Sequence, residues 1–327
     1  MTTFPRTTPS ALDVDARGVL AFVDALESTP GVEPHSFMLL RHGQVAAGGW
    51  WQPYSADRVH LLYSLSKSFT AAAVGIAVRQ GLVDLDATVL SYFPELDADV
   101  TDERSRRMRV RHLLAMASGH REETLERAEA LDPTNTVRGF LLLPPDEEPG
   151  SVFAYNQPCT YTLASIVRRV TGGSLVAWLR PHLLDPLGID DLAWRRDDTG
   201  AEFGFSGCYA TTDAVAKLGQ LYLQDGVWNG ERILPEGFVK FVSTLAPAWA
   251  ADKRPIYGGF FWLNGTGTWP VPTTAYYMLG AGGQVVLIVP SHDLVVVRLG
   301  FDKGEQASVA SLRKALSLLM QAVPSSS

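Results

Sequence analysis

Strand patterns near both ends of the chain limit its fold more than any other feature. Residues 36–40 and 45–51 flank a His-Gly-Gln turn, and residues 284–289 and 294–298 flank a Pro-Ser-His-Asp turn. Two short β-type runs joined by such a turn predict a β-hairpin. One sheet that contains both hairpins would bring the two ends of the chain together.

Helical spacing of apolar residues dominates the rest of the chain. It occurs in residues 13–28, 69–78, 161–170, 213–223 and 306–322. We therefore predict an α/β (α+β) fold, in which an antiparallel sheet built from both chain ends is flanked by the terminal helices and carries a mostly helical inserted region. The predicted boundaries are 1–82 and 228–327 for the sheet domain and 83–227 for the inserted helical domain.

Composition excludes several classes of partner. The 327 residues are 46% hydrophobic and 19% charged, as in a globular protein with a large core. The formal net charge of −7 and the lack of Lys or Arg runs argue against a nucleic acid. No apolar run approaches the roughly 20 residues of a membrane helix, and the N-terminus has no signal-peptide pattern. We therefore expect a cytoplasmic protein without a membrane partner, and the oligomeric state stays open.

Several catalytic and metal-binding motifs are absent. The chain has no His-Glu-x-x-His, no Gly-x-Gly-x-x-Gly, no Gly-x-x-x-x-Gly-Lys-Ser/Thr and no Gly-x-Ser-x-Gly. Its two cysteines are far apart, and its seven histidines form no close pair at ligand spacing. We therefore expect neither a metal nor a cofactor.

The strongest remaining signal is Ser64-Leu-Ser-Lys67, a Ser-x-x-Lys at the start of an alanine-rich predicted helix. Residues i and i+3 share a helix face, so the Ser64 hydroxyl and the Lys67 ammonium can come within hydrogen-bond reach. Burial lowers the pKa of a lysine, which can then activate a serine nucleophile. The alternative is a polar helix start from which Lys67 reaches solvent. Ser311 and Lys314 in the last predicted helix fit the same pattern, but there we expect a solvated face.

The surroundings of Ser64 resemble a known family. Residues 62–70 are similar to the first motif of serine hydrolases related to class C β-lactamases, DD-peptidases and the esterases that share their fold. Further segments resemble the family in the same order, at residues 81–86, 110–119, 186–189 and 221–230. The resemblance runs from about residue 35 to about residue 300. It implies a sheet domain with a helical insert, as in serine β-lactamases and penicillin-binding proteins.

The second motif of that family, Tyr-x-Asn, falls at Tyr155-Asn156-Gln157. The resemblance implies that Tyr155 relays a proton between the serine and the leaving group. The alternative is an ordinary, partly buried loop tyrosine. This chain departs from the pattern, because Asn156 stands in the second place and Gln157 in the third. Either amide is a candidate hydrogen-bond donor to the substrate.

The third motif, Lys-Thr-Gly or His-x-Gly in the relatives, is replaced by Met278-Leu279-Gly280. The resemblance implies an oxyanion hole formed by the amides of Ser64 and Ala281, with Gly280 allowing close backbone approach. The alternative is a simple strand bend at a glycine run. Tyr276 and Tyr277 precede this motif and are candidate pocket residues, together with Met278. Further aromatic candidates for a pocket wall are Trp50, Trp51, Tyr54 and Trp262.

Together these residues predict a serine hydrolase that forms an acyl-enzyme at Ser64 and acts on a small-molecule ester or amide. A carboxylesterase is favoured, because the side chains at 278 and 279 cannot bind a substrate carboxylate. Hydrolysis of a β-lactam or another amide is the alternative within the class, with Arg58 or Arg254 as replacement cation. The alternative from another class is an inactive binding protein on the same fold.

Overall fold

The computed structural model describes residues 4–244 and 257–326. Its main sheet has six strands in the order β2-β1-β11-β10-β9-β8, and all neighbours are antiparallel. The strands are β1 (Val32–Arg41), β2 (Gln44–Trp50), β8 (Trp262–Leu263), β9 (Tyr276–Gly280), β10 (Gln284–Val289) and β11 (Leu294–Asp302). The two terminal hairpins join through β1 and β11, which confirms the predicted sheet from both chain ends.

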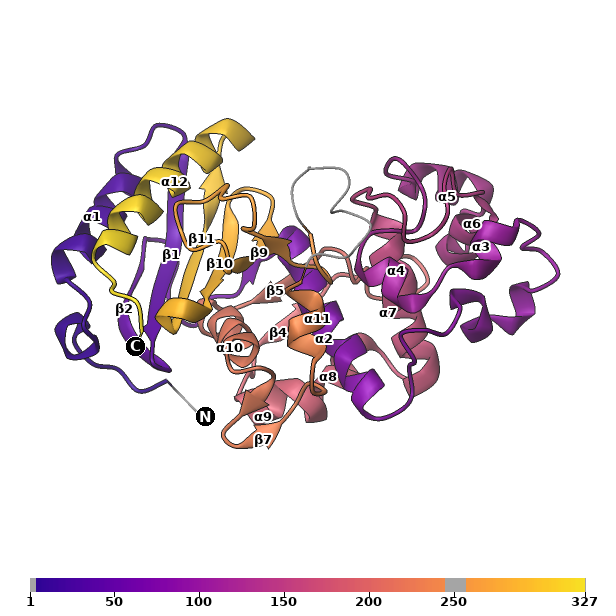
Figure 1. The fold of residues 1–327 in the computed structure, drawn as a ribbon, viewed down its shortest axis with the longest axis horizontal. Helices are drawn as coiled ribbons and strands as arrows, with labels where there is room; N and C mark the ends of the chain where they lie inside the picture. Colours follow the sequence, from indigo (N-terminus) through magenta and orange to yellow (C-terminus); the bar gives the residue numbers. More distant parts are fainter. Residues whose placement is uncertain (1–3, 245–256, 327) are drawn as a thin grey trace.

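Alternate residues of the strands pack into two different hydrophobic cores, one on each face of the sheet. Val285 and Leu287 belong to the core under the terminal helices α1 (Ala16–Glu27) and α12 (Glu305–Gln321). Their neighbours on β10 point the other way, toward α10 (Thr212–Leu223) and the centre of the molecule. Figure 1 shows α1 and α12 side by side along the sheet, as predicted for its flanking helices.

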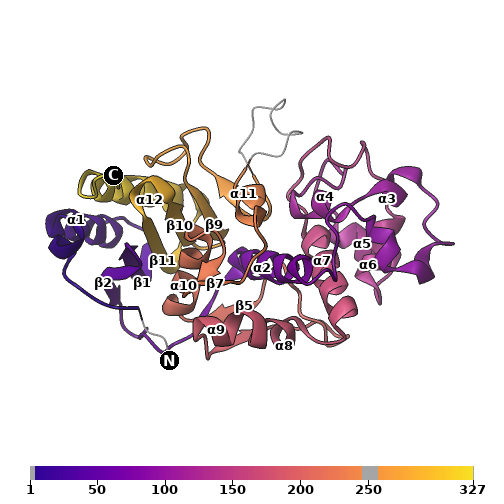
Figure 2. The same ribbon diagram turned by 60° about the horizontal axis from the view of Figure 1, so that its bottom comes forward.

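Helix α2 (Ser66–Arg79) lies at the centre of the protein. All its residues from Ser66 to Ala77 are buried, because its apolar residues cover every side of the helix. It runs between the sheet and the helical region (Figure 2) and packs against α7 (Gln157–Thr171) and α8 (Leu175–Leu179). A short 3-10 turn, Tyr63–Leu65, leads into it. The first residues of α2 therefore lie between the two halves of the fold.

The region between the hairpins is mostly helical, as predicted. Besides α2, α7, α8 and α10 it contains α3 (Glu103–Arg107), α4 (Val110–Leu114), α5 (Leu125–Leu131), α6 (Thr136–Leu142) and α9 (Asp185–Leu187). The domain boundaries stay a prediction, although α10, which the predicted division gives to the insert, packs against the main sheet. In the described part of the chain, no helix is long and apolar enough to cross a membrane.

The sequence analysis did not predict the shorter elements that complete the fold. A second sheet has the strand order β3-β5-β4, from β3 (His60–Leu61), β5 (Cys208–Ala210) and β4 (Leu192–Trp194). A small ribbon, β6 (Val227–Trp228) with β7 (Glu231–Arg232), and α11 (Phe238–Val242) follow α10. Strands of two or three residues are too short to show a period of two, so nothing in the pattern marks them.

Candidate active site

Ser64 and Lys67 meet at the entrance to α2. Ser64 lies in the 3-10 turn before the helix, Lys67 lies in its first turn, and the Lys67 Nζ is 3.2 Å from the Ser64 Oγ. The same ammonium donates to the main-chain oxygen of Phe205 at 2.9 Å. Lys67 is only 1% exposed, so the alternative in which its side chain reaches solvent does not occur. The i, i+3 spacing thus produces the expected contact.

Burial sets the charge of Lys67. Removal from water disfavours the ammonium and lowers the pKa of Lys67 well below its ordinary value, while Glu123 and Cys159 act in the opposite direction. A lysine with a strongly lowered pKa holds a neutral amine at a lower pH than an exposed lysine. The Lys67 nitrogen is therefore suited to accept a proton from Ser64.

Tyr155 completes a polar group around Ser64. Tyr155 and Ser64 line the same cavity, and the Lys67 Nζ lies 4.7 Å from the centroid of the Tyr155 ring. Burial raises the pKa of Tyr155 to about 12, although the neighbouring Ser64 side chain acts in the opposite direction. The phenol is therefore protonated near neutral pH and can act as a hydrogen-bond donor. Its ring stacks on Trp262 with the centroids 5.8 Å apart.

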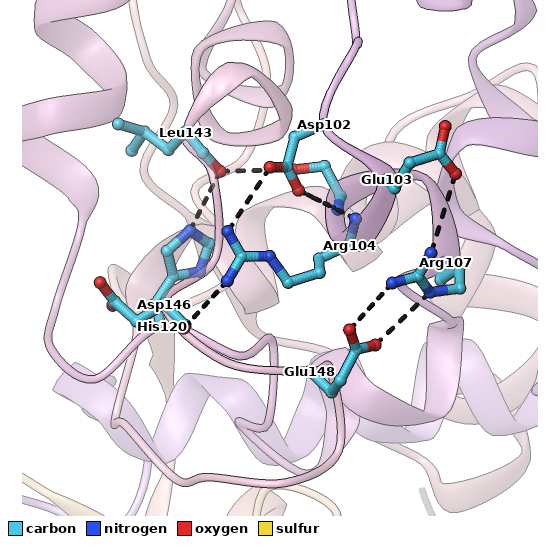
Figure 3. A network of polar contacts seen from close by, with 9 residues as sticks. Asp102, Glu103, Arg104, Arg107, His120, Leu143, Asp146 and Glu148 are labelled. Carbon is cyan, nitrogen blue, oxygen red and sulfur yellow. Dashed lines mark hydrogen bonds and ion pairs between the residues drawn. The ribbon is translucent and has the colours of Figure 1, made fainter.

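The loop that carries Tyr155 is fastened to the helical region. Amides along it donate to the 116–119 segment, from Glu147 to Gly119, from Gly150 to Ala117 and from Ala154 to Met116. Figure 3 shows the side-chain contacts nearby: Arg104 donates to the main-chain oxygen of Asp146 at 3.0 Å, and Arg107 pairs with Glu148 at 2.8 Å. These contacts fasten the loop that leads to Tyr155.

Asn156 and Gln157 follow Tyr155 but do not line the cavity beside Ser64. The Asn156 Oδ1 accepts hydrogen bonds from the amide and the hydroxyl of Thr124, both at 3.0 Å. The Asn156 Nδ2 and the Gln157 Oε1 are buried and have no partner among the described residues. Asn156 thus ties the loop to α5, and a role for either amide in substrate binding stays a prediction.

The end of β9 approaches the nucleophile from the other side. A Cβ on Gly280 would lie 2.2 Å from the main-chain oxygen of Leu62, so only glycine allows this approach. Ala281 begins the turn after β9, and the buried Gln284 donates from Nε2 to the Ala281 oxygen at 3.0 Å and to the Gly300 oxygen at 2.7 Å. Gln284 therefore fixes the turn that carries Ala281.

A cavity of about 490 Å³ brings these residues together. It is lined by Ser64, Tyr155, Trp262, Trp269, Leu279, Gly280, Ala281, Gly282, Gly283, Val285, Asp302, Gly304, Val309 and Leu312. Most of this wall is apolar. The carboxylate of Asp302 is paired with Arg298, with the Nη1 and Oδ2 atoms 2.9 Å apart, and no cation is among the residues that line the cavity.

Tyr276, Tyr277 and Met278 do not line this cavity, which corrects their expected position. The hydroxyl of Tyr276 donates to the Tyr222 oxygen at 3.0 Å in the central core, which also contains Met278. Tyr277 lies on the same face of β9 as Leu279, but the ring of Trp269 packs against it. Because side chains alternate along a strand, Leu279 is the side chain of the third motif that reaches the cavity.

Other predicted residues lie elsewhere. Of the aromatic candidates only Trp262 reaches the cavity, and Trp269 was missed because it stands in a loop without any motif. Arg58 lies over the ring of Tyr54, 5.0 Å from its centroid, and lines a separate pocket. Arg254 lies outside the described residues. Within the described ranges, no group of three or more His, Cys, Asp or Glu side chains could hold a metal ion.

Comparisons with known proteins identify the family of this chain. The profile of the Beta-lactamase family matches residues 21–318. The chain is 28% identical over 290 residues to a 6-aminohexanoate-dimer hydrolase from Paenarthrobacter ureafaciens, covering 81% of this chain and 71% of that protein. It is 27% identical over 210 residues to the esterase EstB from Burkholderia gladioli, covering 56% and 53%.

The fold is shared with solved structures as well. A Bacillus anthracis structure named as a 6-aminohexanoate-dimer hydrolase superposes with a TM-score of 0.77 at 22% identity, covering 99% of this chain and 89% of that one. The agreement extends over the sheet and the helical insert, and the family profile spans most of the sequence. This protein therefore belongs to the Beta-lactamase family.

Proposed function

We propose that this protein is a serine hydrolase that cleaves esters through an acyl-enzyme at Ser64. The observation that carries the proposal is the buried Lys67 nitrogen, 3.2 Å from the Ser64 hydroxyl at the edge of an apolar cavity. A serine needs a base to become a good nucleophile, and a desolvated amine is one. The relatives named above include an esterase and another hydrolase, which supports hydrolysis over a purely binding role.

In the proposed mechanism the Ser64 Oγ attacks the ester carbonyl while its proton moves to the neutral amine of Lys67. The negative charge that develops on the carbonyl oxygen is stabilised by the amides of Ser64 and Ala281. As the C–O bond breaks, the leaving alcohol takes a proton from the Lys67 ammonium, relayed through the phenol of Tyr155. A water molecule then attacks the acyl-enzyme by the same steps in reverse.

The lining of the cavity favours a substrate that is uncharged near the reacting carbonyl. The lining residues include no cation, and Arg298, which lies beside the one carboxylate of the wall, is already paired with Asp302. Burying an unpaired carboxylate would cost several kcal/mol, which corresponds to several powers of ten in kcat/KM. An apolar acyl chain meets no such penalty, and each buried methylene contributes up to about 0.8 kcal/mol.

Amide hydrolysis is the second candidate. It is favoured by the similarity to the 6-aminohexanoate-dimer hydrolase, because a dimer of an amino acid is joined by an amide bond. An amide has a poorer leaving group than an ester, so it depends more strongly on the protonation that we assign to Tyr155 and Lys67.

The test compares kcat/KM for p-nitrophenyl butyrate, N-butyryl-p-nitroaniline and nitrocefin on one preparation, with Ser64→Ala as the control for background hydrolysis. We expect the ester to be the best substrate and nitrocefin to be poor. Anilide turnover equal to that of the ester would favour the amidase. If nitrocefin is turned over as efficiently as the ester, the proposal that the cavity favours uncharged substrates is contradicted. Equal rates for Ser64→Ala and the native protein would refute Ser64 as the nucleophile.

A further inference from the structure

A second hollow adjoins the cavity at α12. This groove has a volume of about 890 Å³ and is lined by Pro270, Val309, Ala310, Arg313, Lys314, Ser317 and Leu318. Val309 lines both the groove and the cavity, and Trp269 of the cavity precedes Pro270 of the groove. The groove therefore begins where the cavity wall ends.

The groove follows one face of a helix. Its lining residues on α12 recur at spacings of three and four, and this stripe extends from Val309 to Leu318. At 1.5 Å per residue that stripe is about 13 Å long. The opposite side of the helix packs against α1 and the sheet, as Figure 1 shows. The length of the groove and the apolar residues in its lining suit one extended hydrocarbon chain.

Two cations distinguish the groove from the cavity. Arg313 and Lys314 are both exposed on it, and no carboxylate is among its lining residues. The Nη2 of Arg313 donates to the main-chain oxygen of Thr268 at 2.6 Å, which holds the guanidinium beside the loop that carries Pro270. An anion at this position would meet two positive charges without being fully removed from water. The cavity wall, in contrast, offers no cation to a negative group.

We propose that the cavity and the groove together bind an elongated ester, whose reacting carbonyl lies at Ser64 and whose far end carries a carboxylate beside Arg313 and Lys314. The inference rests on the proposed function and adds the substrate class, a chain with an apolar middle and a distal anion. The carboxylate that the cavity excludes is thus accepted at a distance. Either the acyl group or the leaving group can supply the long arm.

The kinetic test uses two pairs of esters that differ only in the distal charge. The acyl pair is the p-nitrophenyl monoester of sebacic acid and its methyl-capped diester, and the leaving-group pair is the butyrate of ω-hydroxydecanoic acid and its methyl ester. In at least one pair we expect the acid to have a kcat/KM about three- to tenfold higher than that of the capped ester, since each exposed charge contributes up to about 1 kcal/mol. High salt should reduce this ratio.

The ratio should fall to about one in the double variant Arg313→Ala, Lys314→Ala. The control Lys240→Ala removes an exposed charge on α11, outside the groove, and should keep the native ratio. A ratio near one for both pairs in the native protein would overturn the inference, as would a ratio that the double variant retains in full. Turnover of p-nitrophenyl butyrate in the same preparation shows separately whether the proposed function holds.

A binding measurement makes the inference independent of turnover. Trp262 and Trp269 line the cavity, so tryptophan fluorescence of the Ser64→Ala variant reports occupancy. Monomethyl sebacate should bind several-fold more tightly than dimethyl sebacate, and adding the two groove substitutions should remove the difference. Equal affinities before those substitutions would refute the distal anion site even if the protein hydrolyses no ester.

Discussion

Replacement of Gly280 by alanine tests whether the end of β9 must approach the nucleophile closely. The added Cβ would lie 2.2 Å from the Leu62 oxygen, so either the strand end or the segment before Ser64 must move by about an ångström. A misplacement of that size near the reacting atoms can cost about 10²-fold in rate. Overpacking of this kind costs about 1–3 kcal/mol of stability, which a protein of this size survives. We therefore expect a folded variant whose kcat/KM is lowered about 100-fold.

The assay is kcat/KM for p-nitrophenyl butyrate, with urea unfolding and the rate of fluorophosphonate labelling measured on the same samples. Gly173→Ala is the matched control, since a Cβ there would meet only the Ala177 Cβ, at an ordinary 3.9 Å. It should leave the rate and the stability nearly unchanged. Native kcat/KM in a stably folded Gly280→Ala variant would refute the role that we give to the β9 end. If Gly280→Ala unfolds at the native urea concentration but reacts slowly with the fluorophosphonate, the substitution has impaired the reactivity of Ser64.

Four further predictions concern the polar groups. Fluorophosphonate should add one label, at Ser64, as read by intact mass and peptide mapping; a label on Ser311 or undiminished turnover in Ser64→Ala would contradict this. Lys67→Ala and Tyr155→Phe should each lower kcat by roughly 10²–10⁴ and combine less than additively, and a single variant with native kcat would remove that residue from the mechanism. Because burial lowers the pKa of Lys67 in the folded state, both kcat/KM and the free energy of unfolding should rise with pH through that lowered pKa. The gain in stability should end near 10.5, the ordinary pKa of a lysine in the unfolded chain. Since the pKa of Tyr155 is about 12, its phenol should cause no loss of activity below about pH 10; a profile that falls between pH 8 and pH 10 would contradict the assignment.

The main sheet was predictable because its central strands carry strong local patterns. Residues 284–289 were predicted as a strand and form β10 with the same bounds. Its partner β11 extends four residues beyond the prediction, to Asp302, whose carboxylate is paired with Arg298 inside the protein. The Arg298–Asp302 ion pair is buried, so charge in the sequence did not mark the end of the strand.

The candidate site was predictable only in part. The i, i+3 spacing of Ser64 and Lys67 is local and needs nothing beyond a helix. The partner of Lys67, the main-chain oxygen of Phe205, comes from 138 residues further along the chain, and a carbonyl leaves no mark in the sequence. Which side chain of β9 reaches the cavity depends on the ring of Trp269, which covers Tyr277.

The two Ser-x-x-Lys segments show that the motif by itself does not determine whether its lysine is buried. In the first, Lys67 is buried against Phe205 and Tyr155, so its amine is desolvated beside a hydroxyl at the edge of a cavity. In the second, Lys314 is exposed on α12. Helical spacing is the same in both, and only the surrounding fold makes one lysine a candidate base. Because Lys314 is exposed, its ammonium keeps its positive charge, and this charge is what we propose binds the distal carboxylate in the groove along α12.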